Sequence, residues 1–216
     1  MIAQALIPFF AALSSFGPVD GWDLGILQWI QAHLANPFFD AVMPVLSFLA
    51  DKGWFMILAA VVLIIIPRTR KIGFTMGVAL LLGLIFGNGI LKNLIARTRP
   101  YDLYPALYAP GGPLRLLVHA ESDLSFPSGH TLASFEAAVG LFLWNKKWGS
   151  GALVLAFLIA FSRLYVSVHY VTDVIAGAIL GTCFALLAKF IVDRVAARIE
   201  SAKQKKAALS AEKTEE

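Results

Sequence analysis

Two histidines occur in sequence contexts that suit phosphate chemistry. His130 follows Pro-Ser-Gly at positions 127–129, a pattern typical of a helix start. The free backbone N–H groups and the positive dipole end at such a start favour an anion. His169 precedes Asp173 by four residues, so that on one helix the carboxylate would hold one imidazole nitrogen and leave the other free for nucleophilic attack.

Three basic residues accompany these histidines. Lys92 follows an uncharged apolar run, Arg99 precedes a proline, and Arg163 precedes the His169 segment. Long basic side chains at the end of an apolar helix can simply extend to the membrane interface, but they also form strong charge-assisted hydrogen bonds with phosphate oxygens. Each motif alone permits a purely structural interpretation. Together, the cations, the helix start and the histidines predict a phosphate-binding site.

The composition indicates that these groups are positioned by a membrane protein. The chain has 216 residues, of which 58% are hydrophobic and 15% are charged, whereas soluble domains carry about 25% charged residues. A formal net charge of +4 gives no reason to expect a nucleic-acid partner. The single cysteine, Cys183, excludes an intramolecular disulfide. We expect the lipid bilayer as the main partner and no obligatory protein partner.

Six apolar stretches are candidates for membrane-spanning helices. The clearest is 72–91, whose twenty uncharged residues suit a hydrocarbon core of about 30 Å. The others are shorter or contain a polar residue, and they are 36–50, 53–67, 131–145, 148–162 and 164–188. The sequence therefore predicts an all-α, polytopic membrane helical bundle with about six transmembrane helices.

The distribution of apolar and charged residues predicts three parts of the chain. Residues 1–35 form an N-terminal apolar or interfacial segment, in which 1–16 lack the features of a removed signal peptide and 22–34 have the helical spacing of a surface helix. Residues 36–192 form the transmembrane domain that carries the candidate site. Residues 193–216 form a charged cytoplasmic tail.

Basic residues also indicate the orientation of the bundle. The clusters at 68–71 and 146–147 and the C-terminal lysines fall on one side, which the positive-inside rule makes cytoplasmic. Lys92, Arg99 and Arg163 then lie at the other end with both histidines, where the rule does not predict cations. We expect a multi-pass protein of the cytoplasmic membrane whose site faces the extracytoplasmic side.

The order of the motifs resembles a known family. K-x6-RP occupies 92–100, PSGH occupies 127–130, and SR-x5-H-x3-D occupies 162–173. This arrangement is similar to that of the type 2 phosphatidic acid phosphatase (PAP2) superfamily, whose soluble members include vanadium haloperoxidases and acid phosphatases. The resemblance implies a PAP2/haloperoxidase-like core and a small bacterial membrane lipid phosphatase of the undecaprenyl-diphosphatase kind.

The resemblance also implies a role for each residue. His169 would be the nucleophile that forms a phosphohistidine, Asp173 would orient it, and His130 would be the general acid that later activates water. The residues that would hold the phosphoryl oxygens are Lys92, Arg99, Arg163, Ser128 and Gly129. The sequence has no carboxylate cluster, HExxH or CxxC motif for a metal. We therefore expect no metal and no cofactor, with the cations supplying the electrostatic stabilisation.

The motifs leave other functions open. A haloperoxidase would hold vanadate in the same pocket, but those relatives are soluble and this chain is strongly apolar. A phosphotransferase would pass the phosphoryl group to another lipid, and the choice of acceptor lies outside the motifs. A non-enzymatic lipid-binding or transport protein would use the basic residues to hold head groups and would have no need of His169.

The expected substrate is a lipid phosphate that stays in the membrane. Undecaprenyl diphosphate ranks first, because a diphosphate substrate offers a better leaving group and more oxygens to the cations, including Arg97 or Arg115 if either points inward. Phosphatidylglycerol phosphate or phosphatidic acid is the alternative. The connector 101–125 is rich in tyrosine, proline and glycine, and it forms either an interfacial loop or a lid over head groups. His119 within it is expected at the surface.

Overall fold

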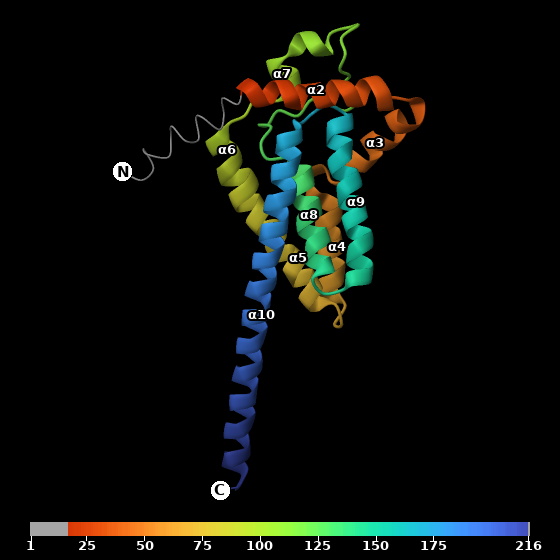
Figure 1. The fold of residues 1–216 in the computed structure, drawn as a ribbon. Coiled ribbons are helices and arrows are strands. Elements are labelled where there is room, and N and C mark those ends of the chain that lie inside the picture. The colour runs from red at the N-terminus through yellow and green to blue at the C-terminus, as the bar shows by residue number, and fades with distance from the viewer. Residues whose placement is uncertain (1–16, 216) are drawn as a thin grey trace, which may run out of the picture.

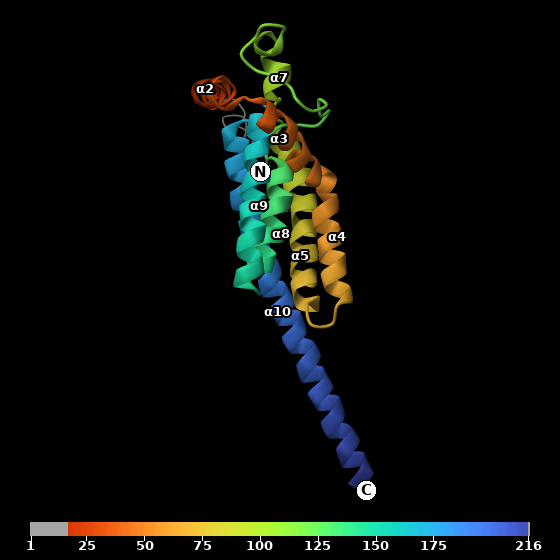
Figure 2. The same ribbon diagram turned by 90° about the vertical axis from the view of Figure 1, so that its right-hand side faces the viewer.

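The fold consists of helices, as the sequence predicts. The computed structural model describes residues 17–215, and within that range every regular element is helical. Residues 1–16, which the sequence analysis treats as a retained segment, lie outside the described residues. Apart from α7 in the connector, the helices from α3 to α10 form the bundle and its extension. Helix α2 (Gly17–Leu34) lies across one end of the bundle in Figure 1 and is seen end-on in Figure 2.

Helix α2 attaches to the bundle through one face. Leu27 and Ile30 on this face are buried, whereas Trp22 and Trp29 are more than half exposed. The chain then turns at Asn36, whose side chain accepts a hydrogen bond from the backbone N–H of Phe39 at 3.0 Å. This N-cap begins α3 (Pro37–Leu49), with its proline in the first turn, where a missing N–H costs nothing.

Two of the six expected spans form a single bent path. Helix α3 is followed by the short helix η1 (Asp51–Gly53) and by α4 (Trp54–Ile65), and the two long helices are bent by 42° at this break. Lys52 and Gly53 both have positive φ there, at 50° and 69°. Two separate spans would require the chain to reverse direction, so the prediction of 36–50 and 53–67 as independent crossings is wrong.

The third predicted span is confirmed as a long helical stretch with a change of geometry. Helix α5 (Arg70–Leu82) continues into η2 (Gly83–Leu91), a π-helix, and then into α6 (Lys92–Ile95). Mid-helix π geometry often occurs at functional sites. Ala96 ends the stretch with a positive φ of 50°. The short helices α7 (Pro100–Leu103) and η3 (Pro105–Tyr108) then begin the connector above the bundle (Figure 1).

Helix α8 (Gly129–Phe142) lies at the centre of the bundle, and most of its residues are buried. It packs against α5, α9 (Lys146–Tyr165) and α10 (Val171–Glu215). Two glycines of α10 allow the close approach of α8. A Cβ atom on Gly177 would lie 2.8 Å from the carbonyl oxygen of Ser128, and one on Gly181 would lie 2.6 Å from that of Leu132. Small residues of this kind permit close helix packing in membranes.

The described residues contain fewer candidate spans than the sequence suggests. Three stretches are long and apolar enough to cross a membrane, and the bent α3–α4 pair makes a fourth. Helix α8 has only 14 residues, about 21 Å at 1.5 Å per residue, which is short of a bilayer core of about 30 Å. The predicted helical bundle is therefore confirmed, but its count of about six spans is not.

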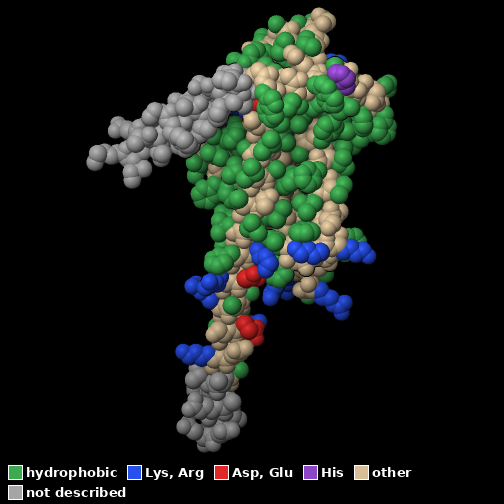
Figure 3. All heavy atoms as spheres, viewed as in Figure 1, with side chains coloured by type: hydrophobic (Ala, Val, Ile, Leu, Met, Phe, Trp, Pro, Cys, Tyr) green, Lys and Arg blue, Asp and Glu red, His purple; other side chains and the backbone are tan. Residues whose placement is uncertain are grey.

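The surface has the pattern of a membrane protein. Hydrophobic side chains cover the middle of the bundle in Figure 3, and Lys and Arg side chains gather below them and along the lower part of α10. The turns between α4 and α5 and between α8 and α9 lie at this lower end (Figure 1), and the basic clusters 68–71 and 146–147 lie in these turns or in the first residues of the helices that follow. Helix α10 extends beyond the bundle as one helix to Glu215.

Candidate active site

The structure brings the predicted site residues to the upper end of the bundle. They come from α6, position 99 just before the connector, the N-cap and first turn of α8, the last turn of α9, the link 166–170 and the start of α10. These eight residues are Lys92, Arg99, Ser128, Gly129, His130, Arg163, His169 and Asp173. All except Gly129 are buried, with relative exposures of 9% or less. So many buried charges are expected only where function or mutual pairing compensates the cost.

His169 and Asp173 meet, but not in the way that the sequence predicts. His169 lies in the link 166–170 between α9 and α10, and α10 begins only at Val171. The pair is therefore not on one helix. Ser167 turns this link with a positive φ of 58°, and His169 Nδ1 lies 3.4 Å from Asp173 Oδ2. The side chain of Ser125 reaches both groups, with its Oγ 3.4 Å from Nδ1 and 2.5 Å from Oδ2.

The other imidazole nitrogen faces a cation. His169 Nε2 lies 3.3 Å from Arg99 Nη1, which also donates to the carbonyl oxygen of Val168 at 3.0 Å. Both the His169 and Arg99 side chains are about 1% exposed. Asp173 therefore holds one side of the ring, while the second nitrogen is directed at a group suited to a phosphoryl oxygen.

A rear cluster of Asp23, Arg97, Thr172 and Asp173 supports this histidine. Arg97 donates to Asp173 Oδ1 at 2.8 Å and to Asp23 Oδ2 at 3.0 Å, and its guanidinium lies 3.7 Å from the ring centre of Tyr170. Asp23 in turn accepts from the backbone N–H of Thr172 at 3.0 Å and from its hydroxyl at 2.6 Å. Helix α2 is thereby joined to the start of α10.

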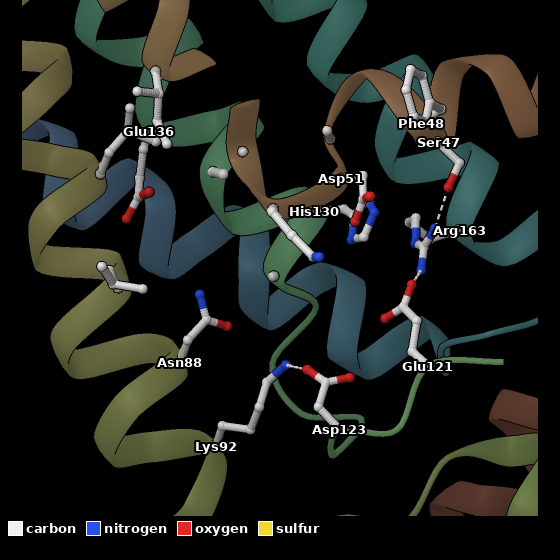
Figure 4. A pocket seen from close by; sticks show the side chains of 18 of the residues that line it. Ser47, Phe48, Asp51, Asn88, Lys92, Glu121, Asp123, His130, Glu136 and Arg163 are labelled. Atoms are coloured by element: carbon white, nitrogen blue, oxygen red, sulfur yellow. Dashed lines mark hydrogen bonds and ion pairs between the residues drawn. The ribbon is translucent and has the colours of Figure 1, made fainter. Parts of the chain in front are cut away.

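A front cluster pairs the three predicted phosphate-binding cations with two acidic residues of the connector. Lys92 Nζ lies 2.5 Å from Asp123 Oδ2. Arg99 contacts the carboxylates of Glu121 and Asp123, and Arg163 contacts Glu121. Figure 4 shows the pairs Lys92–Asp123 and Arg163–Glu121 on the same side of the cavity. We define the front cluster as these five residues.

Electrostatics of the front cluster favour charged carboxylates. Burial alone would raise the pKa of Asp123, but the hydrogen bond from Lys92 and the charge of Arg99 outweigh it and lower that pKa from 3.8 to about 2. Burial likewise opposes ionisation of Glu121, and the neighbouring charges of Arg163 and Arg99 lower its pKa overall. The cations are therefore paired with anions at neutral pH.

A cavity of about 1470 Å³ opens beside the front cluster. Gly129, His130, Lys92 and Arg163 line it, whereas Arg99, Ser128, His169 and Asp173 do not. Ser128 is the N-cap residue of α8, but its side chain caps no backbone N–H and instead accepts from the Thr131 hydroxyl at 3.1 Å. The predicted helix start is confirmed, and its first turn lies at the cavity without a side-chain cap.

Neither Arg97 nor Arg115, which are expected from the sequence to add phosphate contacts if either points inward, is directed at the cavity. Arg97 belongs to the rear cluster, and Arg115 donates to both carboxylate oxygens of Asp40 at 2.8 and 2.9 Å. Neither lines the cavity. His119 is exposed at the cavity rim, in agreement with its expected surface position.

Sequence analysis missed the acidic partners of these cations. Asp23 lies 74 positions before its partner Arg97, a separation at which the sequence carries no signal of contact. Glu121 and Asp123 stand close before His130 in the sequence, and this proximity to the PSGH motif was a usable signal. Among residues 17–215, no group of three or more His, Cys, Asp or Glu side chains is arranged to hold a metal ion.

Comparisons with known proteins find relatives of this chain. The family model of the PAP2 superfamily matches residues 69–196. The chain is 36% identical over 126 residues to an undecaprenyl-diphosphatase of Sulfolobus acidocaldarius, covering 58% of this chain and 57% of that protein. It is 32% identical over 178 residues to a lipid A 4'-phosphatase of Bacteroides thetaiotaomicron, covering 77% and 75%.

A solved structure shares the fold. The crystal structure of a transmembrane PAP2-type phosphatidylglycerolphosphate phosphatase from Bacillus subtilis superposes with a TM-score of 0.67 at 24% sequence identity, covering 89% of this chain and 94% of that chain. The predicted PAP2-like core is therefore confirmed at the level of the fold, and the apolar helices together with these relatives identify a multi-pass membrane protein.

Proposed function

The chain belongs to the PAP2 superfamily, and from this premise we propose that it hydrolyses the terminal phosphate of a membrane lipid through a phosphohistidine intermediate. One observation carries the proposal: Lys92, Arg163, His130 and a helix N-terminus line a cavity that continues between apolar helices, and Arg99 joins His169 to the acidic side chains at this cavity. The first set of groups suits phosphate, and the apolar continuation suits a lipid chain.

The apolar part of the cavity supports a lipid substrate. Helix α4 contributes Ile57, Val61 and Ile64 to one wall, and α5 with η2 contributes Leu80, Leu81 and Leu84 to another. Most of these side chains belong to the surface that would face the bilayer, with Ile57, Val61, Leu81 and Leu84 each at least 45% exposed. A lipid phosphate would place its head at the front cluster and its chain along this groove.

The proposed first step is nucleophilic attack by His169. Its Nε2 forms a bond to phosphorus while the bond from phosphorus to the lipid-side oxygen breaks, and His130 donates the proton that this oxygen takes up. Asp173 holds Nδ1 and stabilises the positive ring that results. The cations and the first N–H groups of α8 would hold the oxygens of the phosphoryl group in the transition state.

The second step returns the enzyme to its starting state. His130 accepts a proton from water, the water oxygen bonds to phosphorus, and the bond from phosphorus to His169 Nε2 breaks. Inorganic phosphate then leaves. A phosphotransferase would differ only in using a lipid hydroxyl in place of water, and measuring phosphate release separates the two outcomes.

Substrate binding requires the front cluster to open. His169 is fully buried, and Arg99 with the acidic pair Glu121 and Asp123 stands between it and the connector surface. A phosphate can replace the two carboxylates on Lys92, Arg99 and Arg163, because a phosphate dianion carries the same total charge and presents three oxygens from a single centre. We therefore favour the lid interpretation of the connector, with residues 121–123 as the part that moves.

For the lipid itself, we rank undecaprenyl diphosphate first. The support is the similarity to an undecaprenyl-diphosphatase at 36% identity and the better leaving group of a diphosphate. Phosphatidylglycerol phosphate and phosphatidic acid remain the second candidates. The test compares kcat/KM for the three lipids in one detergent system, and a preference of about tenfold for either glycerophospholipid would reverse the ranking.

Metal independence and sidedness belong to the same proposal. Activity should persist in excess EDTA, because the three cations supply the positive charge, and restoration of lost activity by Mg²⁺ would contradict this.

The site should face outward. In a Cys183→Ala background, an impermeant thiol reagent on intact cells should label Gly112→Cys in the connector and not Lys146→Cys, and the reverse pattern would invert the topology.

A further inference from the structure

A second polar position lies in the groove, deeper than the phosphate site. Glu136 is on α8, six residues after His130, so it lies about 9 Å further along the helix axis. Its relative exposure is 1%. Its Oε1 atom has no hydrogen-bond partner, and none of the ion pairs among residues 17–215 includes Glu136.

The neighbouring helix leaves room for this carboxyl group. A Cβ atom on Gly83, the first residue of η2, would lie 1.9 Å from Glu136 Oε1. Only a glycine at this position permits the carboxyl to lie against the η2 backbone. The sequence therefore pairs a glycine on one helix with a glutamate on the next, although an apolar residue would fill the same space without a polar group to satisfy.

Glu136 lines the same cavity as the front cluster. Asn88 of η2 also lines the cavity and lies beside the helix start, since a Cβ atom on Gly129 would be 3.1 Å from the Asn88 side-chain oxygen. Figure 4 shows the Glu136 and Asn88 side chains extending into the same part of the cavity. The apolar residues of α4, α5 and η2 line the same cavity.

The chemistry of a buried, unpaired carboxyl selects its ligand. A charged carboxylate without a cation is costly in an apolar helix bundle. The neutral acid is less costly, and it offers one O–H donor together with an acceptor. Such a group, placed below a phosphate site, requires an uncharged acceptor on the bound molecule.

We propose that Glu136 binds an acyl carbonyl oxygen of the lipid substrate and thereby determines which lipids are accepted. The proposal rests on the phosphatase function proposed above. An acylated phospholipid has its ester carbonyls a few bonds from the phosphate, at the depth of Glu136. A polyprenyl diphosphate has only hydrocarbon at this depth, so Glu136 equips the groove for glycerophospholipids in addition to the first-ranked substrate.

The test compares two lipids that differ only in this acceptor. Diacyl phosphatidic acid has ester carbonyls, whereas dialkyl ether phosphatidic acid lacks them. Wild-type enzyme should prefer the diacyl lipid by about fivefold to tenfold in kcat/KM, as expected for one hydrogen bond to an otherwise unsatisfied group. Glu136→Leu should lose this preference, and Glu136→Gln should retain most of it, because an amide also donates and accepts.

Undecaprenyl diphosphate serves as the internal control. Its kcat/KM should change less than about twofold in Glu136→Leu, because no hydrogen bond is lost with that lipid. Equal losses of kcat/KM with all three lipids would show a structural role and overturn the inference. The inference would also be overturned if wild type and Glu136→Leu had the same preference for the diacyl lipid, or if wild type had no such preference. If no lipid releases phosphate, the phosphatase proposal fails, and the diacyl and dialkyl lipids are then compared by equilibrium binding, where Glu136→Leu should still abolish the preference.

Discussion

The front and rear clusters use similar residues for different purposes. Both combine arginine with aspartate or glutamate beside His169. In the rear cluster the Asp23 and Asp173 side chains are fully buried and the Arg97 side chain is 8% exposed. In the front cluster the Glu121 side chain is 28% exposed and the Asp123 side chain is 50% exposed. The rear cluster is closed to solvent, and the front cluster is open to it.

The difference follows from the elements that supply the anions. Asp23 and Asp173 project from the long helices α2 and α10, which cannot move without unpacking. Glu121 and Asp123 belong to a connector segment without regular structure, and such segments open at low cost. The rear cluster therefore fixes the histidine, while the front cluster keeps its cations occupied until a phosphate replaces the carboxylates.

The largest expected effect concerns the histidine between the clusters. His169→Ala should abolish phosphate release while leaving membrane insertion intact, because no other group occupies the nucleophile position. His119→Ala is the matched control, since His119 is exposed at the cavity rim, and it should keep near-normal activity. Phosphate release from purified variants checks both, and near-normal release by His169→Ala would contradict the mechanism.

The next effect should come from the rear cluster. Arg97→Met leaves the carboxylates of Asp23 and Asp173 buried without their cation, which costs about 3–5 kcal/mol in stability. A lower thermal unfolding midpoint and a reduced kcat are both expected. Should the midpoint and kcat stay within error of wild type, the rear cluster would have no supporting role.

A milder change tests whether α2 contributes to positioning. Asp23→Asn keeps the shape of the side chain but weakens its bonds to Arg97 and Thr172, at a cost of about 2 kcal/mol. Because Asp23 does not touch the substrate site, kcat should fall while KM stays nearly constant. An increase in KM with unchanged kcat would argue instead that α2 acts on substrate binding.

The smallest effect is expected from the front cluster. Asp123→Asn removes one carboxylate that competes with phosphate for Lys92 and Arg99, so KM should fall by about threefold, within the range of a half-exposed ion pair. A higher KM would show that Asp123 helps to bind the substrate.

Asp123 has a depressed pKa of about 2, so its ion pairs stabilise the fold above about pH 4 and are lost as pH falls toward 2. The difference in thermal midpoint between wild type and Asp123→Asn should shrink over that interval.

The sequence could predict the front of the site better than its rear. The cations and histidines stand in local motifs, and apolar runs of helical length show which end of the bundle they share. The bend at 50–53 was not predictable, because Lys52 carries positive φ without being glycine or asparagine. The contact of Asp23 with Thr172 arises from tertiary packing. The unpaired state of Glu136 likewise depends on where Gly83 lies, which no local pattern reveals.

Trapping the covalent intermediate tests the central claim most directly. Enzyme quenched during turnover of a substrate labelled in its terminal phosphate should carry label in an acid-labile, alkali-stable form, as expected for phosphohistidine. With a diphosphate substrate, whose leaving group needs little protonation, His130→Ala should form this species slowly and retain it, because the variant also lacks the base that activates water. His169→Ala should carry none. Label retained by His169→Ala, or active wild type that never becomes labelled, would contradict the account.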